Sequence, residues 1–326
     1  MKLVKSTLIA ALLASSALVA GCATETVDAP VATGQEVVLP NTRVLQLNSA
    51  AGGAYRIFIA APSEPAPEGG YPVIYITDGN SIFGAMRDEL IRQLDTTYRT
   101  PTLLVAIGYP EDSPWNPRRE QDLTPVIPGI ENITGPWGEH VPNVGGADDF
   151  LDFIETVVKP SVEAQYPVDR TRQTLTGHSF GGLFTLYTFF TRPTAFQSYV
   201  AMSPSIWLGD RHILTEEAAY RATYPGTPDT SRLLIMVGEC EQIVGECDAA
   251  VPSTPRRDAW LVPEGRMVDN AKEMQARLAE LKGEDVQVHI IPHEHHISVI
   301  GASLSRVTRF ALAEPIIAAK EAAAEE

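Results

Sequence analysis

The chain has 326 residues and a formal net charge of −16, because 41 acidic residues outnumber 25 lysines and arginines. Nucleic-acid binding needs clustered lysine and arginine, and the sequence has no such cluster, so this class of function is excluded. With 44% hydrophobic residues, the composition is that of a globular chain able to bury a full core.

The first 22 residues have the pattern of an export signal. Lys2 and Lys5 give a positive start, residues 8–19 form an apolar run too short for a comfortable membrane span, and Ala20-Gly21-Cys22 follows. This ending resembles a bacterial lipoprotein signal, in which cleavage leaves a lipidated cysteine at the new N-terminus. We therefore expect an exported protein anchored in a membrane through Cys22, facing the periplasm or the cell surface. Ordinary secretory cleavage near Ala20 is the alternative.

One domain is expected between two flexible ends. Residues 23–34 are poor in large apolar side chains, which is typical of a flexible tether. Residues 318–326 are almost entirely alanine and glutamate, and we expect a disordered tail there. The intervening residues 35–317 contain no internal repeat and are predicted to form a single domain.

Strand-like and helical stretches alternate along this domain. The strand-like stretches are residues 37–47, 54–60, 73–76, 102–106, 173–176, 199–202, 233–237 and 286–291. The helical stretches are residues 81–95, 147–165, 181–191, 268–282 and 299–319. Such alternation predicts an α/β protein with a mostly parallel sheet and helices on both of its faces. Residues 207–230 and 242–266 are rich in charge, proline and glycine, and we interpret them as short cap excursions over the pocket rather than core.

The segment Gly177-His178-Ser179-Phe180-Gly181-Gly182 contains a G-x-S-x-G motif between the fifth predicted strand and the helix that follows. A strand-turn-helix elbow of this kind holds the serine in a strained conformation above the sheet, with small residues where side chains would collide. The helix directs its partly positive amino end at the same place. We therefore take Ser179 as the candidate nucleophile. Eight strands with the elbow after the fifth predict an α/β-hydrolase fold.

A nucleophilic serine needs a histidine base and an acid that orients the base, and in this fold the acid and then the histidine follow the serine. Glu239 and Glu241 both follow the strand at residues 233–237; we favour Glu241, with Glu239 as the alternative. Three of the seven histidines follow the last strand. We favour His296, at the boundary between loop and helix, ahead of His295 and His293.

The remaining site predictions concern the oxyanion hole, metals and a disulfide. The oxyanion hole is expected to combine the amide of Phe180 with that of Gly79 or Asn80, in the loop after the third strand. The clustered histidines are suitable zinc ligands in type, but no helical i, i+4 pair supports a site, so no metal or other cofactor is expected.

In an oxidising compartment, Cys240 and Cys247 are expected to form a disulfide, with two buried free thiols as the alternative.

Six motifs in order together resemble the esterase D-like family of α/β-hydrolases, in particular its ferri-siderophore or enterobactin-esterase branch. They begin at Tyr71, Arg119, Gly145, Gly177, Ser203 and Glu294. The resemblance implies a serine esterase that acts on a small-molecule ester, with Ser179 and His296 as its catalytic pair. It also implies that Arg119 lies at the pocket mouth and holds an anionic or oxygen-rich part of the substrate.

Several alternatives stay open. Without the resemblance, Arg119 is better explained as a surface salt-bridge partner of Glu120 or Asp122. Trp207 is a candidate to stack on an aromatic acyl group, although simple packing explains it equally well. The same fold also serves esterases of feruloylated or acetylated carbohydrate, because fold does not fix function. A surface lipoprotein that binds a ligand without catalysis is the more distant alternative.

Overall fold

The computed structural model describes residues 37–93, 100–134, 140–142, 144–224, 230–242 and 265–313. The chain divides into two units between Leu39 and Pro40, and every helix and strand described below lies in the second unit. The predicted signal segment, tether and acidic tail fall outside the described residues, as do Cys22 and Cys247.

All eight predicted strands are present, and they form one sheet. They are β1 (Thr42–Asn48), β2 (Ala54–Ala60), β3 (Tyr71–Ile76), β4 (Leu103–Gly108), β7 (Val168–His178), β8 (Ser198–Met202), β9 (Arg232–Gly238) and β10 (Val286–Ile291). Their spatial order is β1-β2-β4-β3-β7-β8-β9-β10. The pairs β1/β2 and β2/β4 are antiparallel, and the remaining pairs are parallel. The predicted α/β-hydrolase fold is confirmed, with the serine motif at the end of the fifth strand of this sheet. A small antiparallel pair, β5 (Asn132–Thr134) and β6 (His140–Pro142), was not predicted.

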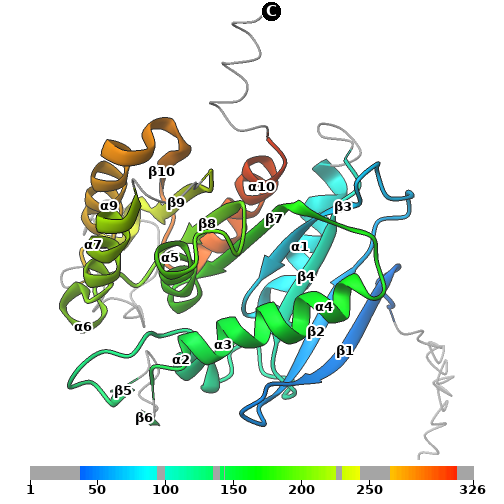
Figure 1. Cartoon of the computed structure of the whole chain (residues 1–326), viewed down its shortest axis with the longest axis horizontal. Helices are drawn as coiled ribbons and strands as arrows, with labels where there is room; N and C mark the ends of the chain where they lie inside the picture. The colour runs from blue at the N-terminus through cyan, green and yellow to red at the C-terminus, as the bar shows by residue number, and fades with distance from the viewer. Residues whose placement is uncertain are drawn as a thin grey trace, which may run out of the picture. The chain divides into compact units, whose positions relative to one another are not determined.

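Helices cover both faces of the sheet (Figure 1). On one face, α1 (Gly79–Gln93) packs against α10 (Ser298–Leu312). On the other face lie α3 (Ala147–Phe153), α5 (Phe180–Thr191), α7 (Ile213–Thr223) and α9 (Met267–Lys282). The structure also describes three short α-helices, α2 (Arg118–Asp122), α4 (Lys159–Glu163) and α6 (Leu208–Arg211), and two 3-10 turns, Glu239–Glu241 and Gly283–Asp285.

Two predicted helix boundaries differ from the structure. The single helix predicted over residues 147–165 is α3 and α4 joined by a π-helical turn, Ile154–Val158. The last helix ends at Leu312 rather than at residue 319, because Ala313 has extended backbone angles (φ −70°, ψ 144°). A run of alanines favours helix but cannot by itself mark where a helix stops.

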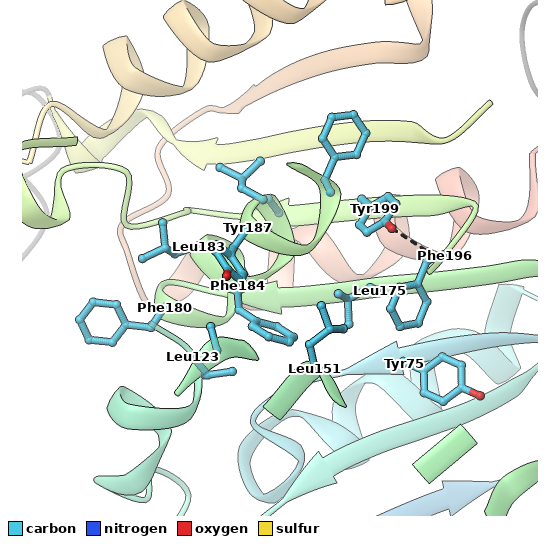
Figure 2. Packing of buried hydrophobic residues seen from close by; sticks show 14 of the residues in the cluster. Tyr75, Leu123, Leu151, Leu175, Phe180, Leu183, Phe184, Tyr187, Phe196 and Tyr199 are labelled. Atoms are coloured by element: carbon cyan, nitrogen blue, oxygen red, sulfur yellow. Dashed lines mark hydrogen bonds between the residues drawn. The ribbon is translucent and has the colours of Figure 1, made fainter. Parts of the chain in front are cut away.

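The helix that follows the serine motif is buried on all sides. Every residue of α5 from Phe180 to Phe190 is buried, because the helix is enclosed by the sheet, α3 and α7. Figure 2 shows Phe180, Leu183 and Phe184 in one hydrophobic cluster with Leu123, Leu151 and Leu175. Displacing α5 would expose large apolar side chains at a cost of about 1.5–3 kcal/mol each. The core therefore holds the amino end of α5, and Ser179 with it, in a fixed position.

The prediction that residues 207–230 lie outside the core is wrong for the part that the structure describes. Ile213 and Tyr220 of α7 are buried, and the ring centroids of Tyr220 and of Phe189 in α5 lie 5.3 Å apart. The charged residues of this segment hid the buried face in the composition, and one of them, Glu217, is itself buried on α7, where it pairs with Arg221 and Arg277. The second predicted excursion, residues 242–266, lies almost wholly outside the described residues.

Candidate active site

Ser179 stands on the bend between β7 and α5 with backbone angles of φ 60° and ψ −114°. A non-glycine residue in such a region costs about 1–3 kcal/mol, so the surroundings must hold it there. The Ser179 amide donates to the Met202 carbonyl at 2.9 Å, and the Ser179 carbonyl accepts from the Ser205 amide at 3.2 Å. Glycine is required at 177, because a Cβ there would lie 2.6 Å from the backbone carbonyl carbon and oxygen of Gly181. The elbow therefore has the tight geometry that the motif predicts.

Three side chains from distant parts of the chain form one line of hydrogen bonds. Ser179 Oγ lies 3.0 Å from His296 Nε2, and His296 Nδ1 lies 2.6 Å from Glu241 Oε2. Glu241 is buried at the turn after β9, and His296 is buried just before α10. This is the arrangement of nucleophile, base and orienting acid found in serine hydrolases. The structure thus brings together Ser179, His296 and Glu241, the three residues predicted from the sequence.

The second oxygen of Glu241 is held independently of the histidine. Glu241 Oε1 accepts hydrogen bonds from Ser203 Oγ at 2.6 Å and from the Gly238 amide at 2.7 Å. With Oε1 occupied by these two donors, Oε2 is left facing His296. Ser203 directly follows β8, at the carboxyl end of a parallel strand, which is where ligands and site residues gather in such sheets. That position was the available signal for the role of Ser203, which was not predicted from the sequence.

The alternative acid, Glu239, and the alternative bases, His293 and His295, have other hydrogen-bond partners. Glu239 Oε2 accepts a hydrogen bond from the His293 amide at 3.2 Å, so this carboxylate is engaged with the backbone of the histidine loop. The His295 amide donates to Ser298 Oγ at 2.9 Å, at the start of α10. Within the described ranges, no group of three or more His, Cys, Asp and Glu side chains is placed to hold a metal ion.

His178, the residue before the nucleophile, supports the loop that carries the base. Its Nε2 lies 2.6 Å from the His296 carbonyl oxygen, and because a carbonyl only accepts, Nε2–H is the donor. The ring is buried, and its centroid lies 4.6 Å from that of His296. Burial, reinforced by His296 and Arg119, keeps the pKa of His178 well below its ordinary value. His178 therefore remains a neutral donor that joins the elbow to the histidine loop.

A neutral buried histidine makes stability depend on pH. The unfolded chain takes up a proton at residue 178 below about pH 6.5 while the folded chain does not, so stability present above that pH is lost as pH falls. Glutamine keeps an N–H donor but does not titrate. His178→Gln is expected to reduce the slope of unfolding free energy against pH between about 6.5 and 5 by up to about 1.4 kcal/mol per pH unit.

Urea unfolding of both proteins at several pH values in this window measures the two slopes. Contributions from other groups, such as His289, whose pKa is also lowered by burial, are common to both proteins and cancel in the difference. Parallel slopes in the two proteins would show that His178 takes up a proton in the folded state.

The predicted oxyanion donors lie at the starts of two helices that follow the neighbouring parallel strands β3 and β7. Phe180 is the first residue of α5 and Gly79 the first of α1, and the first amides of a helix have no acceptor within it. The two starts are close, because a Cβ on Gly181 would lie 3.4 Å from Asp78 Oδ2. The side chain of Asn80 is occupied elsewhere, because Oδ1 accepts from the Tyr109 amide at 2.7 Å and Nδ2 donates to the carbonyl oxygens of Tyr109 and Glu111 at 3.1 Å and 2.7 Å. Only its backbone amide is therefore suited to an oxyanion.

Two predicted substrate-binding residues have different surroundings. The ring centroids of Trp207 and Phe180 lie 6.3 Å apart, so Trp207 lies beside the residue that carries a predicted oxyanion amide. Arg119 is buried, which fits neither a place at the pocket mouth nor a surface salt bridge with Glu120 or Asp122. Its guanidinium instead forms an ion pair with Asp78, with Nε 2.6 Å from Oδ1. The sequence neighbours of Arg119 did not reveal this partner, because Asp78 lies 41 positions away, just after β3.

Cys240 is buried and disulfide-bonded. Its partner lies outside the described residues, so the pairing with Cys247 stays a prediction.

Comparisons with known proteins agree with this geometry. The model of the family described as "Putative esterase" matches residues 48–258. The chain is 35% identical over 286 residues to the ferri-bacillibactin esterase BesA of Bacillus subtilis, covering 86% of this chain and 92% of that protein. It is 36% identical over 279 residues to a siderophore enterobactin esterase of Emericella nidulans, covering 81% and 91%. Among solved structures, the siderophore hydrolase EstB from Aspergillus nidulans is similar with a TM-score of 0.72 and 31% identity, over 85% of this chain and 96% of that chain.

Proposed function

Because this chain is an esterase and belongs to the Putative esterase family, we propose that it cleaves siderophore esters through an acyl-enzyme on Ser179. The observation that carries the proposal is the line of hydrogen bonds from Ser179 through His296 to Glu241. The substrate class is supported by two relatives that are named as siderophore esterases and are aligned with more than four-fifths of the chain.

Acylation uses the three hydrogen-bonded side chains and the predicted oxyanion amides. His296 Nε2 takes the proton of Ser179 Oγ while that oxygen attacks the ester carbonyl, and the Glu241 carboxylate stabilises the imidazolium that forms. The carbonyl oxygen becomes negative and accepts hydrogen bonds from the amides of Phe180 and of Gly79 or Asn80, each worth about 3–4 kcal/mol in the transition state. The C–O bond then breaks, and the alcohol leaves with the proton from His296.

Deacylation repeats these steps with water. His296 takes a proton from a water molecule, the hydroxide attacks the acyl carbonyl, and the same amides stabilise the second oxyanion. Ser179 then leaves with the proton from His296, which releases the acid and restores the free enzyme. Every step uses only water and groups of this chain.

A panel of esters tests the substrate class. The full chain is expected to hydrolyse a cyclic tri-catecholate ester with a higher kcat/KM than feruloylated or acetylated sugars. The reverse order would favour a carbohydrate esterase, which the same fold accommodates. Turnover of none of them, together with no labelling of folded Ser179 by a fluorophosphonate, would favour a lipoprotein that binds a ligand without catalysis.

We also propose that Cys22 carries a lipid and that the esterase is membrane-anchored after export. The support is the sequence, with Lys2 and Lys5 before an apolar run that ends in Ala20-Gly21-Cys22. In the part of the chain that the structure describes, no helix is long and apolar enough to cross a bilayer. Each buried methylene of an acyl chain contributes about 0.8 kcal/mol, so several chains anchor durably. Cys22→Ser is expected to move the esterase from the membrane fraction to the soluble fraction; equal membrane retention would contradict the anchor.

A further inference from the structure

The guanidinium of Arg119 joins the two segments that supply the oxyanion amides. From α2, its Nε and Nη2 lie 2.6 Å and 2.9 Å from the two carboxylate oxygens of Asp78, which is a two-pronged contact. Nη2 also donates to the His178 carbonyl oxygen at 3.3 Å. Asp78 immediately precedes Gly79, and His178 lies two positions before Phe180. One side chain thus contacts both sides of the predicted oxyanion hole.

The Asp78 side of this contact is conformationally demanding. Asp78 has a positive φ of 57°, which non-glycine residues adopt only when their surroundings favour it. Its carbonyl accepts from the amides of Ser81 and Ile82 at 3.0 Å and 3.1 Å, so Asp78 sets the start of α1. The direction of the Gly79 and Asn80 amides therefore depends on how Asp78 is held, and Arg119 holds its carboxylate.

The same contacts leave little of Arg119 for a ligand. A two-pronged contact with a substrate carboxylate or catecholate needs two of the three guanidinium nitrogens, and Asp78 already occupies Nε and Nη2. Taking either nitrogen would weaken a pair whose side chains are only 5% and 1% exposed. Leaving a buried carboxylate without its partner is costly, so the pair is expected to persist while substrate binds.

We infer that Arg119 is a positioning residue, which fixes the α1 start against the elbow so that the amides of Phe180, Gly79 and Asn80 converge on one oxygen. This role rests on the proposed acyl-enzyme function of Ser179. It differs from a substrate anchor because it acts on every ester, whatever the charge of the acyl or alcohol group.

Kinetics of Arg119→Lys and Asp78→Asn in the full chain test the inference, with neutral p-nitrophenyl acetate and a cyclic tri-catecholate ester as substrates. Lysine keeps the positive charge but lacks the planar guanidinium that donates two parallel hydrogen bonds to one carboxylate. Both variants are expected to lower kcat about 100-fold for both esters, with KM little changed, as for a lost oxyanion donor. Arg118→Lys is the matched control: Arg118 is the neighbour on α2 and pairs with Asp122 instead. Its kinetics should stay close to wild type.

A substrate anchor predicts a different pattern. Arg119→Lys would then raise KM for the catecholate ester alone, and Asp78→Asn, by freeing the guanidinium, would lower that KM. Either result, with p-nitrophenyl acetate kinetics unchanged, would overturn the inference. Should Arg119→Lys fail to fold by circular dichroism, Asp78→Asn decides between the two patterns.

The test also separates this inference from the proposed substrate. If the wild type hydrolyses p-nitrophenyl acetate but not the siderophore ester, the proposed substrate is rejected and kcat for the neutral ester still decides the role of Arg119. If the wild type hydrolyses no ester, the rate at which a fluorophosphonate labels Ser179 replaces kcat, because that reaction also places an oxygen in the oxyanion hole. Equal labelling of the wild type and the variants would then reject the positioning role.

Discussion

Replacing Ser179 with alanine is expected to lower kcat for ester hydrolysis by about 10⁶-fold, as for nucleophiles in comparable triads. The Ser179 hydroxyl is the group that His296 Nε2 faces at 3.0 Å, and alanine leaves nothing to acylate. Turnover of p-nitrophenyl acetate, corrected for the uncatalysed rate, measures the loss. A Ser179→Ala protein with wild-type turnover would exclude the acyl-enzyme mechanism.

Ser179→Gly distinguishes lost chemistry from lost folding. The backbone at this position has a φ of 60°, which glycine adopts without the steric cost that a side chain brings. The glycine variant is expected to be as inactive as the alanine variant but more stable, by about 1 kcal/mol or more, because the backbone strain is relieved. Urea unfolding of the three proteins compares their stabilities. A loss of activity accompanied by a loss of stability in both variants would point to misfolding instead.

Replacing Glu241 with glutamine is expected to lower kcat by about 10⁴-fold, the size of effect seen when the acid of such a triad loses its charge. Ser203 Oγ and the Gly238 amide both donate to Oε1, so the glutamine oxygen is required there. Its NH₂ group is then turned toward His296 Nδ1, which must accept. The proton of the neutral imidazole moves to Nε2, and Ser179 no longer faces a base.

Glu239→Gln is the matched control for this prediction. Glu239 lies two positions away in the same turn, but among the described residues its carboxylate accepts from the His293 amide, and a glutamine oxygen can accept that bond as well. Most of the wild-type kcat is therefore expected to remain. Kinetics with a neutral ester compare the two variants, since substrate charge does not then complicate the result. A larger loss in Glu239→Gln than in Glu241→Gln would reverse the assignment of the acid.

Hydrophobic patterning was enough to predict most of the fold. The central strands are buried along their whole length, as β3 and β9 show, and a short apolar run bounded by polar turns identifies such a strand. The elbow could be predicted equally well, because a strand, a G-x-S-x-G turn and a helix occupy one continuous segment. The order of serine, glutamate and histidine along the chain follows from the fold and could be predicted with it.

The sequence by itself determined the strands, the elbow and the candidate residues, because each of these depends on a short continuous window. Only the tertiary structure decided which glutamate meets His296, why Ser203 matters, and that Arg119 binds Asp78. The paired residues lie far apart, with Arg119 41 positions from Asp78 and Glu241 55 positions from His296. The physical reason is that such partners are set by how strand ends meet at one edge of the sheet, and no local pattern of hydrophobicity or turn residues encodes that meeting.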